Sequence, residues 1–145
     1  MNAKVRPLII VLGLVLVFFI FRNSGADYEV LCFECRDCVK AEVMKSEFSR
    51  AKGLMYREEL ARDEGAFFIF ENTGAHGMWM RNMNFPIDII WFDESLRVVF
   101  VHEDVPACRT AECPTYRTGV PARYALEVNA GYVKEHEISE GVKLS

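Results

Sequence analysis

The chain has 145 residues, 51% of them hydrophobic and 26% charged, and a formal net charge of −4. The roughly 120 residues after Ala26 are enough for one domain with a hydrophobic core, and without Lys4, Arg6 and Arg22 they carry 14 basic against 21 acidic side chains. This acidic balance makes nucleic acid and anionic membrane surfaces poor partners for the domain.

The first predicted element is the uncharged apolar run Leu8–Phe21, which follows two positive residues. Such residues stay in the cytoplasm, so we expect the rest of the chain to lie outside it. As a helix this run would be roughly 21 Å long, shorter than a bilayer core of about 30 Å, which favours a cleaved signal peptide. The small residues 24–26 also suit cleavage by signal peptidase. Arg22, directly after the run, favours retention instead. We therefore expect residues 1–26 to be a signal anchor, with secretion of the domain if this segment is cleaved.

Residues 27–38 are expected to form a cysteine-bearing linker. They contain Cys32, Cys35 and Cys38. Outside the cytoplasm cysteines normally pair, and any pairing among these three leaves one thiol over. A disulfide, a thiol–disulfide exchange site and a zinc site completed by a fourth ligand all remain open.

Helices are predicted to be few and short in residues 39–145. Ser46 is expected to cap a helix that Gly53 ends, and Arg57–Ala61 to form a further helical turn. A third short helix is expected over 130–136. Three prolines predict that residues 105–121 are mostly loop.

Short strands are predicted through the rest of the domain: Val39–Met44, Ala66–Phe70, Met78–Met83, Ile87–Phe92, Leu96–His102, Tyr124–Val128 and Val142–Leu144. The strand at 87–92 and the strand at 96–102 are joined across a turn at 93–95. This pattern predicts a mainly β domain, a compact β-sandwich or barrel-like fold with a few short helices, preceded by one N-terminal hydrophobic helix.

Cys108 and Cys113 bracket four residues within the predicted proline-containing loop. We expect them to form a disulfide, because the domain is expected outside the cytoplasm. Closing so small a ring stabilises a protein by roughly 2 kcal/mol on a chain-entropy estimate.

Six separated blocks of residues carry a resemblance to a known family. They are Gly53–Met55, Glu64–Phe70, Met78–Met83, Pro86–Asp93, Cys108 with Cys113–Pro114, and Leu126–Gly131. In this order and spacing they resemble the family called domain of unknown function 192, from about Val39 to the C-terminus. Ala66 and Met83 depart from the family pattern, in which Met and Thr are usual. The resemblance implies a compact β-rich domain, often exported or membrane-anchored, and it implies no reaction.

A hairpin around Asn84–Pro86 would place Asn82 opposite Asp88, and Trp79 opposite Trp91. A buried Asp88 needs hydrogen-bond donors, which the Asn82 amide can supply. This pair fits a structural role, the polar part of a ligand cleft, or a catalytic acid or base. The two tryptophans fit either core packing or a stacking platform for a sugar or peptide.

Glu127, within an apolar strand, presents the same choice between a structural and a functional carboxylate. Together with Asp88 it would form the acid/base pair of a hydrolase, provided that the two side chains approach each other.

Three methionines follow His76: Met78, Met80 and Met83. Thioethers and imidazole suit copper outside the cytoplasm, but the spacing does not form a clean ligand set. Core packing is the interpretation that the pattern favours.

The sequence contains no Ser–His–Asp signature, phosphate-binding loop or HExxH motif. We therefore expect a membrane-tethered extracytoplasmic binding or accessory module, without a resident cofactor or metal, whose ligand is a small molecule, a glycan or an envelope protein. The alternatives are a hydrolase that uses Asp88 and Glu127 and a thiol–disulfide or metal-binding protein that uses the cysteine cluster.

Overall fold

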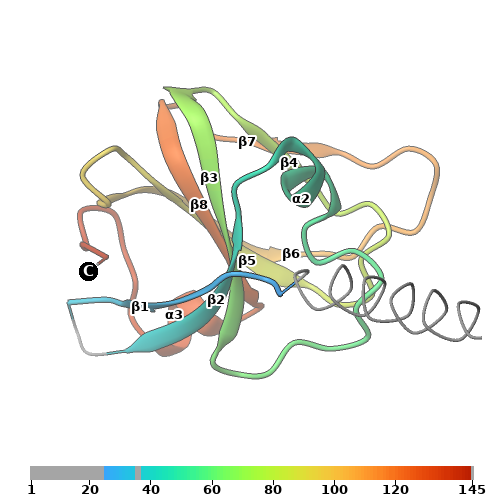
Figure 1. Ribbon diagram of the computed structural model, residues 1–145, viewed down its shortest axis with the longest axis horizontal. Coiled ribbons are helices and arrows are strands. Elements are labelled where there is room, and N and C mark those ends of the chain that lie inside the picture. Colours follow the sequence, from blue (N-terminus) through green and yellow to red (C-terminus); the bar gives the residue numbers. More distant parts are fainter. Residues whose placement is uncertain (1–24, 35–36, 145) are drawn as a thin grey trace, which may run out of the picture.

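The computed structural model describes residues 25–34 and 37–144, and a mixed six-stranded sheet forms its centre (Figure 1). The sheet has the order β1-β2-β3-β8-β5-β6. Its strands are β1 (Tyr28–Cys32), β2 (Cys38–Met44), β3 (Glu64–Gly74), β5 (Ile87–Phe92), β6 (Val98–Val105) and β8 (Ala122–Asn129). Strands β2 and β3 run parallel, and the other neighbours run antiparallel. The expectation of a mainly β domain is confirmed.

A two-stranded antiparallel ribbon stands apart from this sheet. It consists of β4 (Gly77–Trp79) and β7 (Thr115–Arg117). Strand β7 lies in the stretch expected to be mostly loop, and β1 lies in the stretch expected to be a linker. Both are short, and each finds its partner through tertiary contacts.

Two short helices accompany the strands. Helix α2 (Glu47–Lys52) begins after Ser46, whose hydroxyl accepts a hydrogen bond from the backbone N–H of Ser49 at 3.0 Å. Gly53 ends the helix with a φ of 46°, a conformation that glycine adopts readily. These predicted boundaries are confirmed. Helix α3 (Tyr132–Glu135) lies within the expected range 130–136.

The predicted helical turn at Arg57–Ala61 is wrong. No helix is formed over this segment, and the loop that precedes β5 contacts its backbone. The Asn84 amide donates to the carbonyl of Arg57 at 2.8 Å, and the N–H of Tyr56 donates to the carbonyl of Asn82 at 3.0 Å.

Alternating side chains divide the core into two clusters on opposite faces of the sheet. In β8, Leu126 and Val128 belong to one cluster and Ala125 to the other. In β5, Ile90 and Ile89 separate in the same way, and every residue of this strand is buried. A central strand covered on both faces explains the continuous apolar run of β5.

The predicted hairpin between Met78–Met83 and Ile87–Phe92 is wrong. Strand β4 ends at Trp79 and pairs with β7, whereas β5 lies between β8 and β6. After β4 the chain pairs with the disulfide loop, since the N–H of Asn82 donates to the carbonyl of Cys108 at 3.0 Å. The neighbouring prediction, that residues 87–92 pair with the following strand, is confirmed by β5 and β6.

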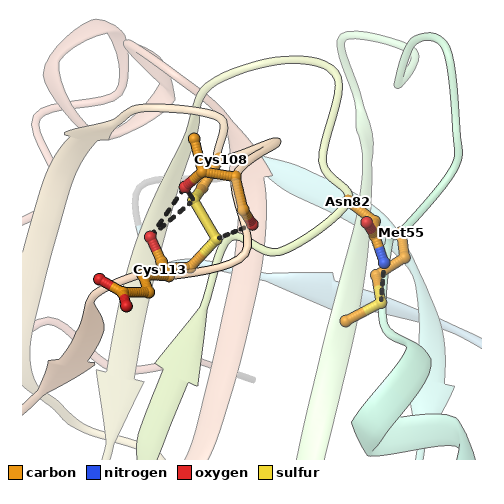
Figure 2. The surroundings of a disulfide bond; sticks show 6 residues. Met55, Asn82, Cys108 and Cys113 are labelled. Atoms are coloured by element: carbon orange, nitrogen blue, oxygen red, sulfur yellow. Dashed lines mark hydrogen bonds between the residues drawn. A yellow bond between two sulfur atoms is a disulfide. The ribbon is translucent and has the colours of Figure 1, made fainter.

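Two cysteine pairs lie at disulfide distance. The predicted pair Cys108–Cys113 is confirmed, with its Cα atoms 5.9 Å apart in the loop before β7 (Figure 2). Cys32 pairs with Cys38 and joins the end of β1 to the start of β2. Cys35 lies outside the described residues.

Non-reducing peptide mapping is expected to recover Cys108 and Cys113 in one linked fragment. Replacing both by Ala should lower the free energy of unfolding by roughly 2 kcal/mol, because the unfolded chain then regains the freedom of the closed loop. Two free thiols at these positions, in protein isolated from its native compartment, would contradict the pairing.

Within residues 25–34 and 37–144, no helix has the length and apolarity needed to cross a membrane. The predicted signal anchor, Leu8–Phe21, lies outside these residues.

Candidate functional site

A cleft of about 260 Å³ is lined by residues of α2, β3, β4 and β8. Most of its lining is apolar. The apolar side chains include Leu54, Phe68, Phe70, Met78, Trp79 and Met83. They come from the turn after α2, from β3, from β4 and from the loop after it. Trp79 is 45% exposed, so its indole stands at the mouth of the cleft rather than within the core.

Glu127 of β8 brings a carboxyl group into this apolar cleft. Strand alternation turns it there, since Leu126 and Val128 on either side face the opposite cluster. The residue is 4% exposed, and its Oε2 atom has no hydrogen-bond partner among the described residues. Burial raises the pKa of Glu127 to about 8, although Arg57 opposes this shift. The carboxyl is therefore mostly protonated at neutral pH.

Gly53 keeps the space beside this carboxyl open. A Cβ atom at this position would lie 3.1 Å from Cζ of Phe68 and 3.7 Å from Oε2 of Glu127. The positive φ of Gly53 also disfavours a side chain. The turn that ends α2 can thus pass close over Glu127, and the glycine predicted as a helix end is also part of the site.

Arg57 is the cation that acts on Glu127, and its guanidinium forms an ion pair with Glu42 of β2. Both of these side chains are partly buried. Of the two influences on the pKa of Glu127, desolvation is the larger. Arg57 was not among the site residues expected from the sequence, in which it stands four residues after Gly53.

The rim of the cleft carries the charged residues Glu47, Arg50 and Lys52 of α2. Arg50 is held in place, because its Nη1 atom donates to the carbonyl of Ile69 at 3.1 Å and its Nη2 atom lies 3.5 Å from Glu71. The rim thus carries charges of both signs, whereas the carboxyl of Glu127 lies deep in the cleft.

Asp88 lies on the opposite face of the sheet from Glu127. It is in register with Val128, whereas Glu127 is in register with Ile89. Residues directly opposite each other on antiparallel strands share a face, so the two carboxylates point in opposite directions. The structure therefore does not bring together the pair on which the hydrolase alternative depends.

The partners of Asp88 are backbone groups, so its predicted pairing with Asn82 is wrong. Asp88 is fully buried, and its Oδ1 and Oδ2 atoms accept from the N–H groups of Asp104 and Val133, each at 2.9 Å. Asp104 has a φ of 53° at an irregularity between β5 and β6. Asp88 thus ties this irregularity to α3, which is a structural role.

Asn82 lies instead beside the turn that follows α2. Its Nδ2 atom donates to the hydroxyl of Tyr56 at 2.8 Å and points at Sδ of Met55 at 4.0 Å (Figure 2). Its φ of 58° places it in a turn, which explains why the predicted strand stops before this residue.

Trp79 and Trp91 do not face each other. Trp79 is in register with Thr115, and Trp91 lies between Ala125 and Phe100. Trp91 is fully buried, and its indole N–H donates to Nδ1 of His102 at 3.1 Å. The core interpretation is therefore confirmed for Trp91, and the alternative of a platform made of both tryptophans is wrong.

The three methionines pack as core residues in the cluster that contains Trp91. His76 stacks on Phe70 with 3.9 Å between ring centroids, and its Nε2 atom lies 2.7 Å from the carbonyl of Asn72. Across the part of the chain that the structure describes, no group of three or more His, Cys, Asp or Glu residues is arranged to hold a metal ion.

Two solved structures share this fold along most of their length. A protein of unknown function from Novosphingobium aromaticivorans is 26% identical with a TM-score of 0.77, over 85% of this chain and 88% of that one. A putative transcription regulator from Sinorhizobium meliloti is 28% identical with a TM-score of 0.76, over 85% of this chain and 96% of that one. No curated protein matches the chain.

The model of the family DUF192, described as "Uncharacterized ACR", matches residues 32–145. This range includes all six blocks that carry the resemblance. It also includes Gly53, Arg57 and Glu127, so the cleft and its carboxyl lie within the matched region. The chain therefore belongs to this uncharacterised family, domain of unknown function 192.

Proposed function

We propose that this protein is a binding module for a small, largely apolar ligand, held outside the cytoplasmic membrane by its N-terminal segment. The observation that carries the proposal is the Oε2 atom of Glu127, buried in an apolar cleft without a hydrogen-bond partner among the described residues. A buried polar atom without a partner costs about 1–3 kcal/mol. A ligand that forms a hydrogen bond with Oε2 would remove this cost, and the gain would favour binding.

The dimensions of the cleft suit a small ligand. Sites for drug-sized molecules measure about 300–1,000 Å³ and are mostly apolar with a few fixed polar groups. The cleft has about 260 Å³, apolar walls and one deeply buried carboxyl. A ligand with a short apolar body and a single polar group matches this arrangement.

A binding role is supported over hydrolysis with Asp88 and Glu127, because the two carboxylates point to opposite faces of the sheet. The S. meliloti structure is described as a putative transcription regulator. The excess of 21 acidic over 14 basic side chains after Ala26 opposes the same role for this chain.

Titration of the purified full-length protein with 1-hexanol is expected to give saturable binding that changes Trp79 fluorescence. Replacing Ala51 by Trp should weaken binding at least about tenfold, because Ala51 lines the cleft and the indole would fill it. Ala61→Trp places the same side chain at an exposed position outside the cleft and should bind as the unchanged protein does. Equal affinities for the two variants would remove the cleft as the binding site.

The proposed location rests on the positive residues ahead of the apolar run. Protease added to spheroplasts, in which the cytoplasmic membrane is intact, is expected to digest the domain. A cytoplasmic marker protein should survive in the same sample. Full protection of residues 124–145 under these conditions would contradict the location.

A further inference from the structure

We infer that the cleft selects an organic ammonium ion, whose N–H group donates to Oε2 of Glu127 while its apolar chain packs between the cleft walls. This inference rests on the proposed binding function and names the chemical class of the ligand. It follows from what surrounds the carboxyl.

The buried acceptor and three aromatic rings line the same cleft. Phe68, Phe70 and Trp79 line the same cleft as Glu127, and the ring of Phe68 approaches the space beside Oε2. Aromatic faces attract cations, and the attraction grows when the cation is removed from water. An ammonium ion gains from both the rings and the carboxylate, whereas an alcohol gains little from the rings and an anion is repelled.

The two arginines near the carboxyl already have other partners in the protein. Arg57 is engaged with Glu42, and Arg50 is engaged with Glu71 and a backbone carbonyl. Among the described residues that line the cleft, Lys52 is the remaining cation, and it is exposed on the rim. Exposed charges are screened by solvent, so the rim opposes an ammonium ion only weakly.

The proton balance of the binding step is simple. The ligand enters as an ammonium ion and keeps its protons, and the carboxyl of Glu127 releases one proton to solvent as the ion pair forms. Burial raises the pKa of this carboxyl to about 8, so about one molecule in ten is ionised at pH 7. A ligand that needs the ionised form therefore loses only about tenfold in affinity at this pH.

Hexylammonium and 1-hexanol are a matched pair of probes, since an alkylammonium ion resembles the side chain of lysine and stays protonated from pH 6 to pH 8. Calorimetric titration of the full-length protein is expected to show hexylammonium affinity rising about tenfold from pH 6 to pH 7 and levelling above about pH 8. Buffers with different ionisation enthalpies should reveal the release of close to one proton below pH 7. The affinity of 1-hexanol should change little over the same range.

Glu127→Gln is expected to bring the ratio of the two affinities at pH 8 from about tenfold or more down to about one. Glu103→Gln, an exposed carboxylate outside the cleft, should keep the ratio of the unchanged protein. If Glu127→Gln does not fold, the proton release that accompanies hexylammonium binding to the unchanged protein still tests the inference.

The outcomes separate the two proposals. Saturable binding of 1-hexanol, together with a hexylammonium affinity that is no higher or does not vary with pH, would overturn the ammonium inference and leave the binding function standing. Binding of neither probe would overturn the binding function and the inference with it. Tighter binding of hexylammonium with proton release would establish both.

Discussion

Replacing Glu127 by Gln is expected to remove most of the change in stability that the unchanged protein shows between about pH 5 and pH 8. The pKa of this carboxyl is about 8 in the folded chain, against an ordinary value of 4.5. Between these values the folded state binds more protons than the unfolded state. The free energy of unfolding therefore falls as the pH rises, by roughly 1 kcal/mol for each pH unit.

The sign of this effect follows from burial. The neutral carboxyl is tolerated in the apolar cleft, and the ionised one is not, so the stabilisation is complete below pH 4.5 and is lost as the pH rises through 8. Gln keeps the shape of the neutral acid and does not ionise. The Gln variant should therefore be the more stable protein at pH 8, by a few kcal/mol on this scale.

Urea unfolding at pH 5, 6, 7 and 8 measures the effect directly. Glu103→Gln removes an exposed carboxylate from β6 and should preserve the pH dependence of the unchanged protein. If Glu127→Gln kept the same slope against pH, Glu127 would not be the buried titrating group, and its role in the cleft would need revision.

Replacing Asp88 by Ala is expected to cause one of the largest losses of stability for any single polar residue, about 3 kcal/mol or more. The change removes both acceptors of the N–H groups of Asp104 and Val133. Each buried donor left without a partner costs about 1–3 kcal/mol, and hydrogen bonds to a charged group lie at the upper end. Water does not readily replace the carboxylate, because Asp88 is fully buried.

Asp93→Ala is the matched control for this prediction. Asp93 also accepts two backbone hydrogen bonds, from Ser95 at 2.8 Å and Arg97 at 3.0 Å, but it does so in an exposed turn where water can take its place. Its loss should be about 1 kcal/mol. The free energy of unfolding of both variants can be measured by thermal or urea unfolding. Equal losses would contradict the prediction that burial makes the hydrogen bonds of Asp88 harder to replace.

The features that depend on neighbouring residues could be predicted from the sequence. A capping serine and a terminal glycine set the limits of α2, and the turn at residues 93–95 joined β5 to β6. The pairing of Cys108 with Cys113 followed from their short separation. In each case the interacting groups lie a few residues apart, so local hydrogen bonding and loop length are sufficient.

Which of the two carboxylates lies in the cleft depends on long-range strand pairing and could not be predicted. Asp88 and Glu127 both lie in apolar strands and look alike in sequence, but the register of β5 against β8 points them to opposite faces of the sheet. Strand alternation determines which residues share a face within one strand, and it does not determine how two distant strands align. That alignment depends on packing across the whole sheet. It leaves Asp88 with two backbone donors and Glu127 with an unpartnered oxygen among the described residues.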